Sequence, residues 1–155
     1  MPAPIISHLI CSIALIALIF VMQFSYFYIV ENIQIEMIKR ELKEVADYVS
    51  HTLENLRFLV NSTTENISLE KELSLPPIIK GSIYVVEILG NVDSASSISA
   101  YLKDRFFIRA DSWLIPGLKI LGLSYVESGE KKIIAGCRRE GVDIYVWIQS
   151  GGEVV

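Results

Sequence analysis

The sequence contains no Asp, Glu, Lys or Arg between Met1 and Val30, although 14 basic and 18 acidic side chains follow. This segregation indicates a membrane segment joined to a soluble body. The stretch from Ile5 to Val30 would rise about 39 Å as a helix, more than the roughly 30 Å hydrocarbon core of a bilayer. It is also too long for the apolar region of a cleaved secretory signal. We therefore expect a retained transmembrane anchor over residues 1–30, with the aromatic residues 26–28 at the membrane interface.

The chain has no excess of positive charge, and it has few cysteines. Its formal net charge is −4 at pH 7, whereas a nucleic-acid-binding surface needs clustered Lys and Arg in excess. We therefore expect no nucleic-acid partner. Cys11 lies in the apolar run and Cys137 lies far downstream, so we do not expect them to pair. No Cys-x-x-Cys spacing is present for zinc.

Histidine is absent from residues 81–155, because His8 and His51 both lie earlier. This excludes Ser/His and Cys/His catalytic arrangements within that part of the chain. No Gly-rich phosphate loop and no metal-ligand spacing occurs either. The charged run "CRREGVD", residues 137–143, imitates an ion-binding patch, but a soluble hairpin tip predicts the same composition. We expect a protein that is not an enzyme and that uses no cofactor or metal.

Glycine and proline are absent between Gln23 and Leu73, so no residue type there demands a helix break. Apolar residues past Val30 recur every three or four residues, about 3.7 on average, which is helical spacing. We expect an amphipathic continuation of the same helix over residues 31–62. Because the repeat exceeds 3.5, the stripe favours packing in a multi-helix assembly or against the chain's own downstream domain over a dimeric coiled coil. The predicted stripe consists of Ile38, Leu42, Val45, Val49, Leu53, Leu56 and Val60.

Residues 63–80 change character, because small polar residues come first and Pro76-Pro77 cannot continue a helix. We expect a linker here, or a packed return segment. Two Asn-x-Ser/Thr sequences, at Asn61 and Asn66, are candidate N-glycosylation sites if this side of the membrane faces outward.

The pattern from residue 81 to 155 is that of β-strands. The runs "SIYVVEIL", "GLKILGLSYVE", "KKIIAGCRR" and "VDIYVWIQ" are β-branched or aromatic and are separated by Gly-containing turns. The last three predict an antiparallel meander, while residues 98–108 fit a short helix or a strand. The expected core positions include Ile83, Val85, Ile120, Ile134, Ile144 and Val146.

These elements predict an α+β fold, in which a long N-terminal helix, transmembrane and then amphipathic, precedes a small antiparallel β-sheet head. The order resembles the lollipop architecture of type IV pilins and pseudopilins. It is most similar to archaeal pilin-like proteins, in which a run similar to "LSLPPIIKGSIYVVEI", residues 73–88, follows the long helix. The resemblance implies a structural subunit held in the lipid bilayer and extracted by an ATPase-driven assembly platform. Its filament, pseudopilus or secretion apparatus would have a core of bundled helices from related subunits.

The orientation of the single-pass protein follows from two opposing signals. Lys39, Arg40 and Lys43 lie near the expected membrane exit and favour a cytoplasmic head by the positive-inside rule. The sequences at Asn61 and Asn66 and the resemblance favour an extracytoplasmic head at the cell surface, which we expect. An alternative function is a single-pass membrane sensor or accessory subunit, whose head binds a ligand or partner.

Overall fold

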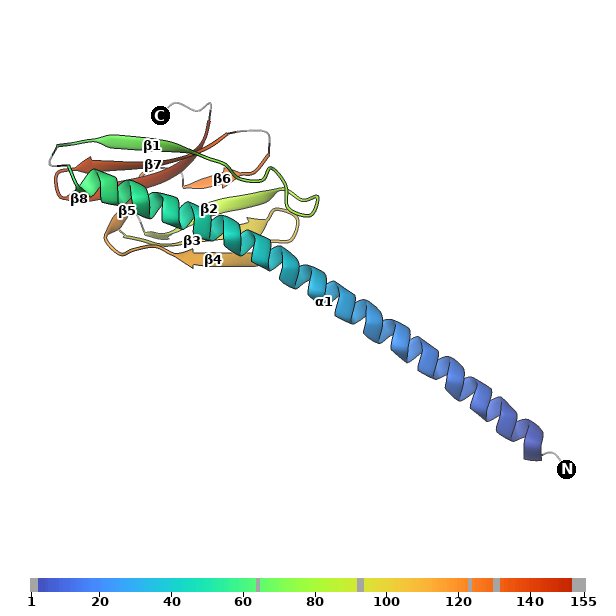
Figure 1. Ribbon diagram of the computed structural model, residues 1–155. Coiled ribbons are helices and arrows are strands. Elements are labelled where there is room, and N and C mark those ends of the chain that lie inside the picture. The colour runs from blue at the N-terminus through green and yellow to red at the C-terminus, as the bar shows by residue number, and fades with distance from the viewer. Residues whose placement is uncertain (1–2, 64, 92–93, 123, 130–131, 152–155) are drawn as a thin grey trace. The chain divides into compact units, whose positions relative to one another are not determined.

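The computed structural model describes residues 3–63, 65–91, 94–122, 124–129 and 132–151, with side chains described from residue 6 onward. The chain divides into two compact units, Met1–Met37 and Ile38–Val155, which we call the first and second units. Helix α1, Ala3–Asn61, contributes residues to both units (Figure 1). The predicted α+β fold, a long helix followed by a β head, is confirmed.

Helix α1 ends where short polar side chains take over the hydrogen bonds of its last turn. The backbone N–H of Ser62 donates to the carbonyl oxygens of Phe58 and Leu59, and the Ser62 hydroxyl also donates to Leu59 at 2.7 Å. The Thr63 hydroxyl donates to the Val60 carbonyl at 2.9 Å. Side chains of this kind compete with the helical backbone and therefore favour helix ends over helix interiors.

The second unit contains two four-stranded sheets. One has the order β1-β7-β8-β5 and the other has the order β4-β3-β2-β6 (Figure 1). Neighbouring strands are antiparallel except β5 and β8, which pair in parallel. The strands are β1 (Ser68–Leu73), β2 (Tyr84–Asn91), β3 (Ser94–Leu102), β4 (Arg109–Trp113), β5 (Leu118–Ile120), β6 (Tyr125–Glu127), β7 (Ile133–Glu140) and β8 (Asp143–Ser150).

The range 63–80 contains a strand of the head. Strand β1 lies within it and pairs along its whole length with β7, so the packed return segment describes this range better than a linker does. The sequence "SLEKEL" is polar because β1 is an edge strand whose side chains are mostly exposed. Only Leu73, at its end, is fully buried.

The predicted meander is correct for β7 and β8 but wrong for the strands before them. The β7–β8 hairpin turns at Gly141, whose φ of 63° favours glycine. Strand β5, however, pairs in parallel with β8, and β6 pairs with β2 in the other sheet. Residues 98–102, left open between helix and strand, belong to β3. Strand-like composition identifies a strand, but its partner depends on packing elsewhere in the chain.

The core of the second unit combines the inner faces of the sheets with one face of α1. Tyr84 is the largest fully buried side chain, and its hydroxyl donates to the Pro76 carbonyl at 2.6 Å. Burial raises the pKa of Tyr84 to about 12. Among the expected core positions, Val85, Ile144 and Val146 are buried, and Ile120 and Ile134 are half-buried. Ile83 is 41% exposed, so its assignment to the core is wrong.

Candidate functional site

The apolar part of α1 in the first unit exposes its side chains on all sides. Large apolar residues from Ile6, 55% exposed, to Met37, 49% exposed, lie in residues 6–37, which we call the apolar segment. A helix that is hydrophobic around its whole circumference is stable in a membrane or inside an assembly, not in water. By length and composition, α1 is the one helix among the described residues that could cross a bilayer.

The predicted stripe lies in the second unit, and all of its residues are buried there. Leu42, Val49, Leu53 and Val60 have no exposed surface, and Ile38, Val45 and Leu56 are at most 8% exposed. Of the two alternatives that the sequence left open, packing against the chain's own downstream domain describes this burial. The side chains of the stripe are therefore not available to other subunits while the head is folded.

Three further residues of α1 are buried beside the stripe and were missed by the sequence reasoning: Ala46, Ser50 and Thr52. A search for large apolar residues passes over them because they are small or polar. Ala46 follows the stripe residue Leu42 at the i, i+4 helical spacing, and Ser50 follows Ala46 at the same spacing. This spacing is the signal that could have identified them.

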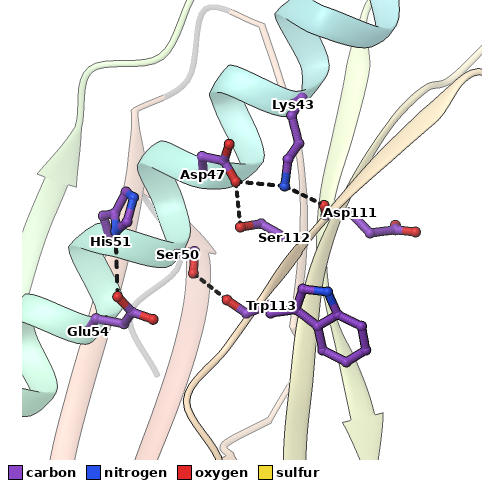
Figure 2. Close-up of polar contacts among 8 residues, drawn as sticks. All are labelled: Lys43, Asp47, Ser50, His51, Glu54, Asp111, Ser112 and Trp113. Carbon is purple, nitrogen blue, oxygen red and sulfur yellow. Dashed lines mark hydrogen bonds and ion pairs between the residues drawn. The ribbon is translucent and has the colours of Figure 1, made fainter.

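Two side chains of α1 bond the open edge of strand β4 (Figure 2). The Ser50 hydroxyl donates to the carbonyl oxygen of Trp113 at 2.7 Å, and the Lys43 ammonium donates to that of Asp111 at 2.8 Å. Strand β4 is an edge strand. Its Leu114 neighbour donates to Ser96 of β3, so the alternation of an antiparallel ladder points the carbonyls of Asp111 and Trp113 away from β3. The helix thus satisfies acceptors that a neighbouring strand would otherwise use.

Asp47 lies between these two contacts. One of its carboxylate oxygens, Oδ1, accepts the Ser112 hydroxyl at 2.6 Å and forms an ion pair with the Lys43 ammonium at 2.8 Å (Figure 2). Burial raises the pKa of Asp47, but hydrogen bonds from Lys43 and Ser112 and the Lys43 charge outweigh it and hold the pKa below its ordinary value. On the exposed side of the helix, His51 and Glu54 pair at 3.4 Å. The cluster is suited to fixing α1 against β4.

Arg139, on β7, connects the end of α1 to the β7–β8 turn. Its guanidinium donates to the carbonyls of Asn61 and Thr63, and its Nε donates to the Gly141 carbonyl at 2.9 Å. A cation at this position satisfies carbonyls that have no partner within the helix. The charged run 137–143 was expected to be a solvated hairpin tip, and the capping role of Arg139 was missed because it depends on contacts distant in sequence.

The two candidate glycosylation residues lie near Arg139, and both are exposed. The Asn61 carbonyl accepts the Arg139 guanidinium at 3.5 Å. The Asn66 side-chain oxygen, Oδ1, accepts the backbone N–H of Gly141 at 3.1 Å. This second bond uses the carbonyl oxygen of the amide and not the nitrogen that would carry a glycan.

The two cysteines occupy different environments, and neither forms a disulfide. Cys11 is exposed in the apolar segment, and Cys137 is buried on β7. Burial raises the pKa of the Cys137 thiol to about 11, which keeps it protonated and unreactive at neutral pH. No group of three His, Cys, Asp or Glu side chains in the described ranges is placed to hold a metal ion.

Comparisons of the chain with protein-family models, with characterised proteins and with solved structures found no match. The function is therefore inferred from the geometry of the two units.

Proposed function

We propose that the chain is a structural subunit of a type IV pilus-like or pseudopilus-like surface filament, or an accessory protein of such an apparatus. The observation that supports this most directly is the contrast between the two parts of α1. Nearly all side chains of the apolar segment are exposed, whereas the stripe is buried in the core of the second unit. The first part thus has a surface that requires lipid or protein partners, whereas the stripe residues of the second part are already buried within the head.

In this proposal the apolar segment has two successive environments. Its residues up to Val30 lie first in the bilayer as a single-pass anchor, and the segment then packs against the same segment of related subunits when an assembly platform extracts the protein. Both environments are apolar, so the same side chains serve in each. The contacts between subunits therefore fall on residues 6–37, before the head begins.

The head is extracytoplasmic in this proposal, at the surface of the cell. The exposed positions of Asn61 and Asn66 support this side, because a glycan at either residue would meet solvent. Protease added to intact cells is expected to remove the head and leave a membrane-protected fragment. Digestion of the head only after the cells are opened would contradict this orientation.

Electron microscopy of surface appendages, combined with mass spectrometry of the purified material, tests the assembly. The proposal predicts that filaments contain this chain and that a deletion of residues 6–37 removes it from them. Mass spectrometry would also identify the N-terminal residue of the assembled form and any glycan on Asn61 or Asn66. Recovery of the chain solely as a membrane protein, with none in any filament fraction, would contradict the proposal.

A sensor or accessory subunit is the second candidate, and it is favoured by the outer face of the β4-β3-β2-β6 sheet. Trp113 is 82% exposed there. On the same face, the Tyr101 hydroxyl donates to Glu87 at 3.2 Å. Aromatic rings beside hydrogen-bonding groups are typical of ligand contacts. This candidate predicts a symmetric pairing of anchor helices in place of a filament.

A further inference from the structure

The turn between β3 and β4 (Figure 1) consists of residues 103–108. It contains two adjacent exposed phenylalanines, Phe106 and Phe107. The Ile108 N–H donates to the Arg105 carbonyl at 2.8 Å, which places Phe106 and Phe107 at the two central positions of a tight turn. Their side chains are 74% and 66% exposed. Turn positions favour Gly, Asn, Asp and Pro, so two large apolar rings at a turn tip have a cost in water that a partner would offset.

The base of this turn is held firmly. Leu102 and Ile108 are buried on either side of the two phenylalanines, and the Leu102 N–H donates to the Ile108 carbonyl at 3.3 Å. The rings therefore cannot fold back into the core without breaking the end of the β3–β4 hairpin. Their exposure is a fixed property of the fold.

A second exposed apolar pair lies beside this turn. The Lys103 N–H donates to the Ile83 carbonyl at 3.0 Å, which joins the turn to the segment between β1 and β2. That segment reverses at Lys80 and Gly81, both with positive φ. Ile78 and Ile83, on either side of the reversal, are 53% and 41% exposed. Apolar side chains from two segments distant in sequence thus occur at the same end of the second unit.

This end is the one at which the chain enters the second unit. Lys43 bonds Asp111 and Ser50 bonds Trp113, so β4 and α1 run in the same direction here. Residues before Asp111 on β4 therefore lie toward the start of the unit at Ile38. The ion pair between Lys80 and Glu41, at 3.5 Å, places the other segment at the same end.

Ile38 follows closely on the expected membrane exit at Val30. Both residues belong to α1, and the intervening helical rise is about 12 Å. The entry end of the second unit is thus within a short distance of the headgroups for any chain anchored by the apolar segment. In the run "KDRFFIR", residues 103–109, Lys103 pairs with Glu127 at 2.7 Å. Arg105 and Arg109 are exposed on either side of the phenylalanines, and their charge suits anionic headgroups.

We propose that the second unit rests on the bilayer surface through Phe106 and Phe107, with Arg105 and Arg109 at the anionic headgroups. The proposal rests on the membrane anchoring in the proposed function. It gives the head a second lipid contact in addition to the anchor, in the state before assembly. Aromatic side chains are well suited to this depth because they prefer the interface between headgroups and acyl chains.

Tryptophan fluorescence of the full chain in vesicles tests this contact. The vesicles contain phosphatidylcholine and phosphatidylglycerol whose acyl chains carry bromine, which quenches tryptophan at close range. A Trp113→Phe background retains only the buried Trp147. In that background we expect Phe106→Trp to shift its emission to the blue and to lose intensity in brominated vesicles relative to unbrominated ones.

Phe58→Trp is the matched control, because Phe58 is 76% exposed, as Phe106 is, but lies near the other end of the helix in the second unit. We expect no quenching there. Phe20→Trp, in the apolar segment, reports the anchor and is expected to be quenched. Quenching at Phe20→Trp but not at Phe106→Trp would overturn the surface contact alone. Absence of quenching at Phe20→Trp would instead contradict the anchoring on which the proposed function depends.

A third outcome identifies a different occupant of the turn. A blue shift at Phe106→Trp that does not depend on bromine but grows with protein concentration means that another protein copy covers the phenylalanines. This result would also overturn the contact with lipid.

Discussion

The hydroxyl of Ser50 donates to the carbonyl oxygen of Trp113 at 2.7 Å and so connects the C-terminal part of α1 to the edge of a sheet 63 positions away in the sequence. Ser50 is 3% exposed, whereas Trp113 is 82% exposed, so the bond joins a buried donor to the backbone of an exposed residue. Together with the Lys43 bond to Asp111, it covers an edge that would otherwise be open to another strand.

Replacement of Ser50 by alanine should destabilise the second unit by about 1 kcal/mol, because the Trp113 carbonyl loses its side-chain donor. The measurement is chemical denaturation of the detergent-solubilised protein, followed by tryptophan fluorescence. Ser62→Ala is the control, since the Ser62 hydroxyl bonds only the neighbouring turn of the helix. An equal loss of stability in the two variants would show that the bond from Ser50 to β4 contributes no more to stability than a bond within the helix end.

Replacement of Leu53 by alanine should lower the free energy of unfolding of the second unit by about 2–5 kcal/mol, the cost of a cavity at a fully buried leucine. Leu59→Ala, on the same helix but 53% exposed, should change it far less. The same denaturation experiment on monomeric protein in detergent makes the comparison. If Leu53→Ala were as stable as the wild type there, the stripe would pack against other subunits and not within the chain.

The stability that Asp47 provides should depend on pH in a defined direction. Because its folded-state pKa lies below the ordinary value of 3.8, the ionised carboxylate stabilises the fold above that value. This contribution declines as the pH falls through the folded-state pKa. The stability difference between the wild type and Asp47→Asn should therefore be constant near neutral pH and shrink in acid. A difference that stays unchanged down to strongly acidic pH would contradict the role of the Lys43 and Ser112 contacts.

A control for the acid experiment is Glu44→Gln, since Glu44 is exposed on the same helix. We expect this variant to follow the wild type through the whole pH range. Since the Asp47 side chain is 41% exposed, solvent screens its interactions, and the effect should be modest.

The periodic features of the structure were predictable, and its long-range contacts were not. Residues 31–62 follow a helical repeat, and the seven stripe residues occupy the buried face that this repeat defines. The partners of β5 and β6, by contrast, are strands distant in sequence. Strand β1 was hidden by its polar composition, which reflects an edge position and not a lack of structure.

The polar contacts of the site are long-range contacts too, and they were not predictable from the sequence. Ser50, Lys43 and Arg139 each act through a backbone carbonyl of a distant segment. The sequence gives no indication of such acceptors, because every residue has a carbonyl and only the fold determines which of them lack a partner. For the same reason, the phenylalanines of residues 103–108 were recognisable as apolar but not as exposed.

Cysteine cross-linking along the apolar segment tests most directly the central claim, that subunits assemble through residues 6–37 and not through the stripe. Variants with one cysteine each along residues 10–20 of a Cys11→Ser chain would be co-expressed in pairs, so that bonds between different positions can form. They would be oxidised in native membranes or filaments, where buried Cys137 stays protected. A filament displaces successive subunits along its axis, so we predict bonds between different positions at a constant offset. Bonds only between identical positions would indicate the symmetric dimer of a sensor and contradict the account, as would the absence of bonds.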